Sequence, residues 1–354
     1  MAPPTPLPTR KLGRNGPEIP AIGLGLMGLS IAYGDPGDES SRLAFLDHAW
    51  SIGCTNWDTA DAYGDCEDLL GKWFSLHPER RKDIFLASKF GLTGRVTPEG
   101  EFKFGINSTP GYVRQSIDKS LKRLGVDYLD LYYVHRTDGK TPIEKTVEAL
   151  KELKEQGKIK AIGLSECSSN TLRRASKIVQ IDAVQVEYNP WQLDIENETG
   201  TNLLETCREL GVTVFAYSPL GRGFLTGQIK SLDDFAADDF RRIVARFNPE
   251  NFPKNLEVVE KLGEIAKRKG CTTGQLALAW LMAQGPDIIP IPGTKKIKYL
   301  EENVASVNVT LSDKDIKEIR TTINSAEVRG DRGIPGLFED ISVSEQLYQD
   351  TPEL

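Results

Sequence analysis

The stretch YLDLYYVHRTDGKTPIEKTVEALKELKEQGKIKAIGL, residues 128–164, contains one complete unit of the predicted fold. It begins with an apolar run at 128–134 and ends with a second run at 159–164. Between them, apolar residues recur at steps of four and three, which places them on one face of a helix: Ile143, Val147, Leu150 and Leu153. A strand, a helix and a second strand in this order predict two parallel neighbouring strands.

The start of this helix has its own signal. Thr141 and Glu144 have the spacing of a capping box, and Pro142 suits the first helical position. We therefore expect the helix to begin at Pro142 with Thr141 as its cap.

The same alternation continues along most of the chain. Eight strand-like runs occur, at about 20–25, 54–58, 83–89, 128–134, 159–164, 181–187, 212–217 and 287–291. Most are continuously apolar rather than alternating, as expected for strands covered on both faces. Eight strands with intervening helices predict an α/β protein with a (β/α)8 barrel.

The length of 354 residues exceeds that of a minimal barrel, and the surplus has identifiable places. Residues 9–22 predict a hairpin before the first strand, with Asn15-Gly16 at its turn. Extra helices are expected at 272–285 and at 311–323. Residues 220–252 form a long polar loop, and the tail at 326–354 is also a loop. We predict a single domain over 1–354, with its barrel core at about 20–310.

Composition excludes several classes of protein. A net charge of −7 disfavours nucleic-acid binding, and no apolar run reaches the roughly 18 residues of a membrane span. The Pro-rich N-terminus does not resemble a secretory signal. Five scattered cysteines without a CxxC pair indicate free thiols. These features predict a cytoplasmic protein with no metal and no disulfide framework.

Four polar residues near the ends of predicted strands indicate a catalytic site. Asp58, Lys89 and His135 each end an apolar run, and Tyr63 follows Asp58 by five positions. Each residue has a structural explanation on its own, such as a helix cap for Asp58. Strand ends of a parallel barrel meet on one face, however, so the four are expected together.

Together these side chains can deliver a proton to an oxygen. A phenol has a reference pKa of about 10, and we expect the Lys89 ammonium to lower the pKa of Tyr63. Asp58 would hold Lys89, whose burial without a partner is costly. The imidazole of His135 could donate a hydrogen bond to a developing alkoxide. This chemistry suits hydride addition to a carbonyl, and a hydride requires a carrier.

The glycine motif GLGLMG at 23–28 matches a dinucleotide fingerprint but opens no helical pattern, so we do not assign it to a cofactor. The later strands offer a better set. Ser165 and Gln185 could bind an amide, and Tyr217 could stack on a flat ring. Thr294, Lys295 and Lys296 precede a helix and could bind phosphate.

The motifs DTADAYG, ASKFG, YYVHR, GLSE, QVEYNP, AYSPLGRGFLTG and IPIPGTKK together resemble the aldo-keto reductase superfamily over about residues 10–325. They are most similar to its branch of pyridoxal reductase-like enzymes from fungi, plants and bacteria. The resemblance implies NADPH-dependent reduction of aldehydes, with ketones as a further class, and a small carbonyl substrate. It implies Tyr63 as general acid, tuned by Asp58 and Lys89, with His135 orienting the carbonyl.

The resemblance also implies the binding residues. The cofactor set is Ser165, Glu166, Gln185, Tyr217, Ser218, Pro219, Leu220, Gly221, Arg222, Gly293, Thr294, Lys295, Lys296, Glu302 and Asn303. The expected substrate pocket comprises Met27, Tyr33, Arg136 and Trp191. One residue departs from the family pattern, since Glu166 stands where many members have Asn beside the nicotinamide carboxamide.

Two other classes of protein remain as alternatives. The same fold serves as a non-enzymatic NADPH-binding regulatory subunit of the potassium-channel β type, which turnover would distinguish. A metal-dependent barrel hydrolase would need a cluster of ligands, and only one of the three histidines ends a strand.

Overall fold

The computed structural model describes residues 6–96, 102–236, 239–333 and 347–354. Its central feature is a sheet of eight strands, all paired in parallel in the order β12-β11-β10-β9-β8-β5-β4-β3. The strands are β3 (Leu24–Gly25), β4 (Asn56–Asp58), β5 (Phe85–Phe90), β8 (Leu129–Val134), β9 (Ile159–Ser165), β10 (Ala183–Glu187), β11 (Thr213–Tyr217) and β12 (Ile288–Pro290). The predicted (β/α)8 barrel is confirmed.

Two glycines of the GLGLMG motif close the barrel between its first and last strands. The amide of Gly23 donates to the carbonyl of Pro290 at 2.9 Å, and that of Gly25 donates to Pro292 at 3.2 Å. A Cβ atom at Gly23 would lie 2.8 Å from Cγ2 of Ile291. Side chains at this seam would separate the strands, so these glycines serve the close approach of two backbones.

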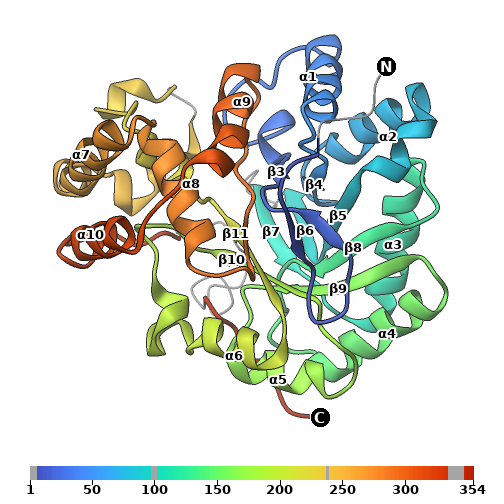
Figure 1. Cartoon of the computed structure of the whole chain (residues 1–354). Coiled ribbons are helices and arrows are strands. Elements are labelled where there is room, and N and C mark those ends of the chain that lie inside the picture. Colours follow the sequence, from blue (N-terminus) through green and yellow to red (C-terminus); the bar gives the residue numbers. More distant parts are fainter. Residues whose placement is uncertain (1–5, 97–101, 237–238, 334–346) are drawn as a thin grey trace.

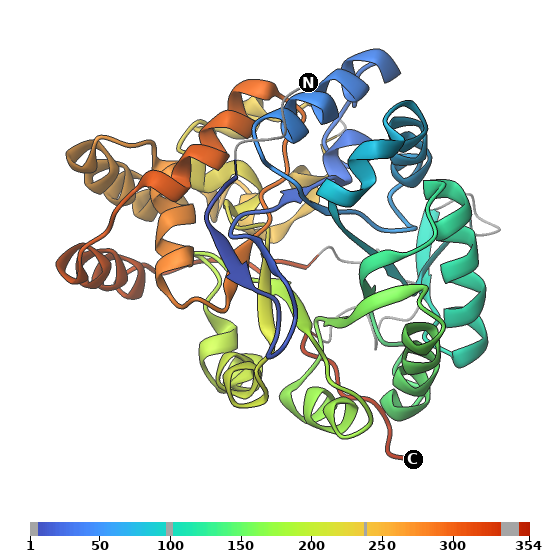
Figure 2. The same cartoon turned by 45° about the vertical axis from the view of Figure 1, so that its right-hand side comes forward.

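Helices surround the sheet, as Figures 1 and 2 show. They are α1 (Glu39–Ser51), α2 (Cys66–Leu76), α3 (Pro110–Leu124), α4 (Ile143–Glu155), α5 (Ser169–Ser176), α6 (Leu203–Leu210), α7 (Phe252–Lys269), α8 (Thr273–Ala283), α9 (Ile297–Ala305) and α10 (Asp313–Asn324). Both extra helices, α8 and α10, are confirmed near their predicted positions. None of the helices in the described ranges is long and apolar enough to cross a membrane.

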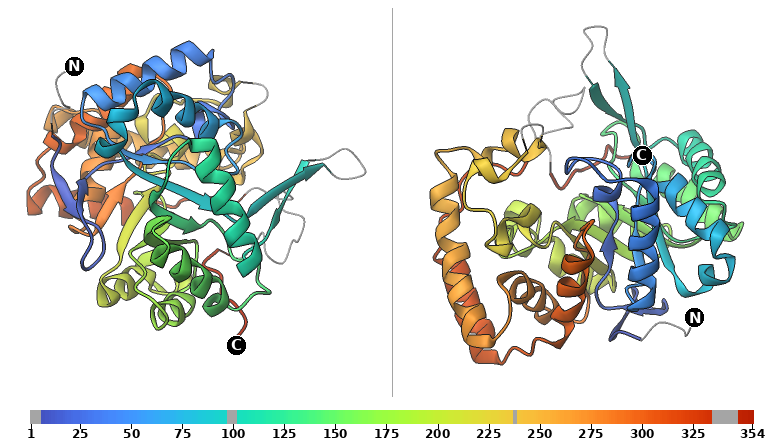
Figure 3. Two further views of the ribbon diagram at one scale, coloured as in Figure 1. Left: turned by 90° about the vertical axis from the view of Figure 1, so that its right-hand side faces the viewer. Right: turned by 90° about the horizontal axis from the view of Figure 1, so that it is seen from above.

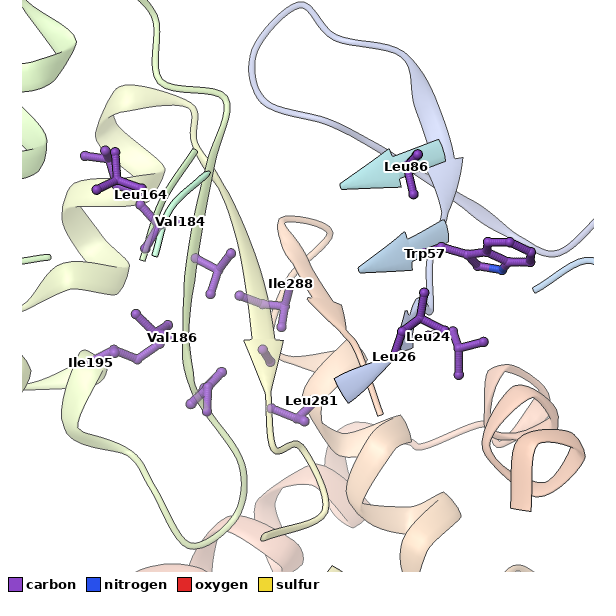
Figure 4. Packing of buried hydrophobic residues seen from close by; sticks show 14 of the residues in the cluster. Leu24, Leu26, Trp57, Leu86, Leu164, Val184, Val186, Ile195, Leu281 and Ile288 are labelled. Atoms are coloured by element: carbon purple, nitrogen blue, oxygen red, sulfur yellow. The ribbon is translucent and has the colours of Figure 1, made fainter. Parts of the chain in front are cut away.

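Alternate strand residues enter two different apolar clusters. On β5, Leu86 packs in the large cluster between strands and helices, whereas Phe85 and Ala87 pack in a smaller one inside the barrel. Figure 4 shows part of the large cluster, with Trp57 and Leu86 on neighbouring strands. This packing keeps the strand ends fixed, which is the condition for a precise site. All five cysteines are free thiols, as predicted.

The N-terminal hairpin is formed by β1 (Thr9–Lys11) and β2 (Glu18–Pro20), as predicted. Its Leu12 and Ile19 belong to the cluster inside the barrel. The hairpin therefore closes one end with apolar side chains, and the site lies at the carboxyl ends of the strands.

The expected capping box is wrong. Helix α4 begins at Ile143, and its cap residue Pro142 offers no side-chain hydrogen bond. The Thr141 hydroxyl donates instead to Asp138 at 2.8 Å, and Glu144 pairs with Arg174 at 2.7 Å. Thr141 is thus held in a local turn by Asp138, three positions before it, and Glu144 by a distant arginine, so neither side chain caps the helix.

A second hairpin was absent from the sequence prediction. Strands β6 (Leu92–Val96) and β7 (Phe102–Ile106) pair antiparallel after β5 and project from the barrel (Figure 3).

Part of the tail, including Gly336, lies outside the described residues. At the end of the chain the amide of Gln349 donates to Glu166 O, and that of Ser168 donates to Gln349 O. This returns residues 347–354 to the end of β9.

Candidate active site

A cavity of about 680 Å³ opens at the carboxyl ends of the strands, within the size range of small-molecule sites. Three of the four predicted catalytic residues line it, namely Asp58, Tyr63 and His135. The fourth, Lys89, is fully buried directly beside them.

Asp58 and Lys89 form a buried ion pair across neighbouring strands. Lys89 Nζ lies 2.5 Å from Asp58 Oδ1 and also donates to the carbonyl of Thr59 at 2.8 Å. The second oxygen of Asp58 accepts from Gln185 Nε2 at 2.8 Å. Burial is the largest single influence and acts to lower the pKa of Lys89, but the charges and hydrogen bonds of Asp58 and Tyr63 together outweigh it and raise that pKa above its usual value. Lys89 is therefore a fixed positive charge.

The hydroxyl of Tyr63 lies next to the Lys89 ammonium. Lys89 Nζ lies 3.4 Å from the Tyr63 oxygen. Burial nevertheless raises the pKa of Tyr63 above its usual value, and the opposing effect of Lys89 is smaller. The expectation that Lys89 lowers the pKa of Tyr63 below its usual value is therefore wrong, because removal from water favours the neutral phenol. The phenol keeps its proton at neutral pH, as a proton donor must.

His135 completes the group from the end of β8. Its ring lies edge-on to that of Tyr63, with 5.8 Å between centroids. Burial, reinforced by Lys89 and Arg136, lowers its pKa well below the usual value. Nδ1 is buried and has no hydrogen-bond partner among the described residues. The imidazole is neutral and carries one N–H to present to an oxygen.

Most residues predicted for the cofactor and substrate line the same cavity. They are Met27, Tyr33, Arg136, Ser165, Gln185, Tyr217, Ser218, Pro219, Leu220, Arg222, Gly293, Thr294, Lys295, Lys296, Glu302 and Asn303. Glu166, Gly221 and Trp191 do not belong to this lining. Trp191 is buried behind it, with its ring 4.3 Å from that of Phe224.

The lining fits a dinucleotide with phosphate groups. Arg222 Nη1 is buried without a hydrogen-bond partner in the described parts of the chain, although it carries charge. Lys295 donates to the carbonyls of Tyr33 at 2.7 Å and Asp35 at 2.5 Å. Lys296 forms no ion pair within the described ranges. Cations with unused donors suit phosphate oxygens.

Arg332 is a site residue that the sequence analysis missed. It comes from the C-terminal segment, lines the cavity, and forms a bidentate pair with Glu166 at 2.8 and 3.0 Å. The Glu166 carboxylate also accepts from the Tyr217 hydroxyl at 2.9 Å and from the amide of Glu187 at 3.1 Å. The signal that could have found this pair is the carboxylate itself, since a charge at the end of a buried strand requires a cation.

Backbone strain also gathers here. Glu166, Ser218 and Arg222 have positive φ angles of 52°, 46° and 57°, although none is glycine. Such conformations are costly and concentrate at functional sites, where the surrounding contacts enforce them.

The structure is thus a barrel with a buried Asp–Lys pair, a tyrosine and a histidine gathered at its strand ends, beside a cavity lined by cations. The chain belongs to the aldo/keto reductase family, whose model matches residues 21–324. It is 51% identical over 352 residues to aldo-keto reductase yakc, designated NADP(+), of Schizosaccharomyces pombe, covering 98% of this chain and 99% of that protein. It is 50% identical to aldo-keto reductase str7 of Strobilurus tenacellus, over 92% of this chain and 95% of that one.

Two solved structures share the fold. The glycerol dehydrogenase AKR11B4 of Gluconobacter oxydans matches with a TM-score of 0.80 and 25% identity, over 91% of this chain and 97% of that one. The thermostable aldo-keto reductase Tm1743, solved with the inhibitor epalrestat, matches with a TM-score of 0.68 and 32% identity, over 89% and 100%. Both matches are consistent with the assignment of this chain to the aldo/keto reductase family.

Proposed function

We propose that this protein reduces aldehydes, with ketones as a second substrate class, to alcohols at the expense of NADPH. The observation that carries the proposal is the contact of the buried Asp58–Lys89 pair with the Tyr63 hydroxyl. The NADP(+) designation of the yeast relative supports the choice of cofactor.

Each of the four residues at the strand ends has a role in the proposed reduction. A bound nicotinamide cofactor supplies the hydride to the carbonyl carbon. His135 donates its N–H to the carbonyl oxygen and orients it. Tyr63 then transfers its proton to the oxygen as negative charge develops there, and Lys89 stabilises the resulting phenolate. Asp58 and Gln185 hold Lys89 in place, and a proton from solvent restores the phenol.

The cofactor residues divide by chemistry. Ser165 would bind the nicotinamide carboxamide, and Tyr217 would lie against the ring. Arg222, Lys295 and Lys296 would bind phosphate groups, since they line the cavity with charges that described carboxylates do not fully satisfy. Glu166 has a different task, because both of its oxygens are engaged by Arg332.

The direct test is a screen for NADPH oxidation. Purified protein is supplied with aromatic, aliphatic and heterocyclic aldehydes, pyridoxal among them, and absorbance of NADPH is followed. We expect turnover with at least one class and a 1:1 ratio of alcohol formed to NADPH consumed. Tight NADPH binding without measurable turnover of any aldehyde would refute the proposal and favour a regulatory subunit.

A further inference from the structure

Arg136 lines the cavity and forms no ion pair with a carboxylate of the described residues. It directly follows His135 at the end of β8. The other arginines nearby are paired, Arg241 with Asp239 at 2.6 Å and Arg332 with Glu166 at 2.8 Å. Arg136 has no ion-pair partner within 4.0 Å among the described residues.

The hydrogen bonds of Arg136 leave much of its guanidinium free. Nη1 donates to the carbonyl of His135 at 2.7 Å and to Ser165 Oγ at 3.1 Å. The donors on Nε and Nη2 have no partner in the described parts of the chain. Neither atom is fully buried. Three N–H groups are therefore available to a ligand.

The residues around Arg136 favour the binding of an anion to its guanidinium. Apolar side chains of Ile31, Leu92, Ile106 and Leu347 line the same cavity. Burial raises the pKa of Glu166, and the charges of Arg332 and then Arg136 lower it, but both oxygens of that carboxylate are already bonded to Arg332. A half-buried cation between apolar walls gains most from a ligand that brings the opposite charge.

The cofactor phosphates do not account for Arg136. The cations that suit them, Arg222, Lys295 and Lys296, follow β11 and β12, whereas Arg136 follows β8 beside the proton-donating group. The substrate is the ligand that approaches His135 and Tyr63, so its substituents are the groups within reach of Arg136.

We propose that Arg136 binds the carboxylate of the substrate, and that the preferred substrates are aldehydes that carry a carboxylate group. A planar guanidinium with free donors on Nε and Nη2 matches the two oxygens of a carboxylate. This inference rests on the proposed carbonyl reduction and specifies the substrate class of the same site.

The test compares each acid with its uncharged methyl ester. The 2-, 3- and 4-carboxybenzaldehydes are each paired with the methyl ester of the same isomer, and kcat and KM are measured for the wild type, Arg136→Met and Arg136→Lys. Arg114→Met is the matched control, since Arg114 lies on the surface of α3 and pairs with Glu152. Binding of benzoate and benzamide to the NADPH-loaded enzyme is measured by calorimetry as a readout independent of turnover.

We expect the wild type to prefer at least one acid over its ester. Arg136→Met should lose about 10- to 150-fold in kcat/KM for that acid, mainly through KM, and change little for the ester. Benzoate binding should weaken in parallel, and Arg136→Lys should recover part of both.

Three results would overturn the proposal. Equal losses for acid and ester, with weaker NADPH binding, would make Arg136 a positioning residue for Ser165. Greater activity with 3-formylphenyl phosphate than with any carboxybenzaldehyde would assign the site to phosphate esters. Normal turnover of the esters with no preference for the acids would refute the carboxylate site alone, whereas no turnover of any aldehyde would refute the proposed function itself.

Discussion

Arg332 and Glu166 are 166 positions apart in the chain, yet their side chains meet in two hydrogen bonds of 3.0 and 2.8 Å. Glu166 ends β9 in a strained conformation, with φ at 52°. Arg332 also donates to the hydroxyl of Tyr217 at 3.0 Å. The ion pair thus fixes the C-terminal segment to the residue expected to contact the nicotinamide ring.

Removing one partner of this pair should destabilise the protein. Arg332→Met would leave the Glu166 carboxylate buried without its cation, which costs about 3–5 kcal/mol in comparable pairs. We expect a corresponding loss in the free energy of unfolding at pH 7, measured by urea denaturation. The double variant Arg332→Met/Glu166→Gln is the control, and it should recover part of the loss because the Glu166 charge is removed. The neighbouring buried Glu187 keeps Arg222 and Arg246 within 4.0 Å.

The pH dependence of stability gives the same pair a second test. Burial raises the pKa of Glu166, but Arg332 and Arg136 outweigh it and hold that pKa at about 2. The folded-state pKa lies below the unfolded one, so the pair contributes fully above about pH 4.5, and this contribution of about 3 kcal/mol is lost as pH falls towards 2. In Arg332→Met the carboxyl should gain stability on protonation instead. Parallel curves for wild type and variant between pH 7 and 4 would contradict the assignment.

Cofactor preference should depend on Lys295 and Lys296. Both line the cavity before α9, and their charges suit the 2′-phosphate that distinguishes NADPH from NADH. The double variant Lys295→Ala/Lys296→Ala should bind NADPH about 10- to 150-fold more weakly, with NADH nearly unchanged. Fluorescence titration at fixed ionic strength measures both. Lys298→Ala, outside the cavity lining, is the matched control, and equal losses for both cofactors would place the phosphate elsewhere.

Much of the fold was predictable because it depends on local periodicity. The runs at 128–134 and 159–164 and the apolar stripe between them correspond to β8, β9 and α4. The β6–β7 hairpin was missed. The alternation of FKFGI is a strand signal, but GLTGRV has few apolar residues and no recognised two-residue turn joins the two runs. The capping box failed because its two side chains have other partners. Asp138 binds Thr141 within a local turn that the prediction did not consider, and Arg174, which binds Glu144, is 30 positions away.

The gathering of Asp58, Tyr63, Lys89 and His135 was predictable because strand ends of a parallel barrel converge. What the sequence could not supply were contacts between distant segments. Gln185, expected at the carboxamide, donates to Asp58 and so belongs to the hydrogen-bond network around Lys89. Arg332 lies in a tail whose pattern predicts only a loop. The direction in which the pKa of Tyr63 shifts could not be predicted either. It depends on whether burial, which raises this pKa, outweighs Lys89, which lowers it.

His135 should remain neutral across the physiological range. Burial, with Lys89 and Arg136, places its pKa well below 6.5. We expect its ring nitrogens to show neutral chemical shifts in ¹⁵N NMR down to pH 6, with His135→Asn used to assign the signal. A signal that titrates between pH 6 and 7 would mean that the imidazolium, rather than the neutral ring, faces the carbonyl.

Lys89 should matter most when Tyr63 must lose its proton. Alcohol oxidation requires phenolate as base, and without the ammonium the pKa of Tyr63 would rise further. In Lys89→Met, oxidation at pH 8 should fall by about 10²-fold or more and recover in part at higher pH. Lys72→Met, on the surface of α2, is the control. A pH profile with the wild-type shape would show that Lys89 serves only to hold the fold.

The proposed function depends above all on the proton of Tyr63, and Tyr63→Phe removes it while keeping the ring. The measurement is single-turnover reduction of the best aldehyde by NADPH-loaded enzyme, followed in a stopped-flow instrument, with the NADPH dissociation constant determined in parallel. We predict unchanged NADPH binding and a rate of hydride transfer lower by about 10²-fold or more, because the alkoxide then lacks its acid. A rate within a few-fold of the wild type would contradict the account.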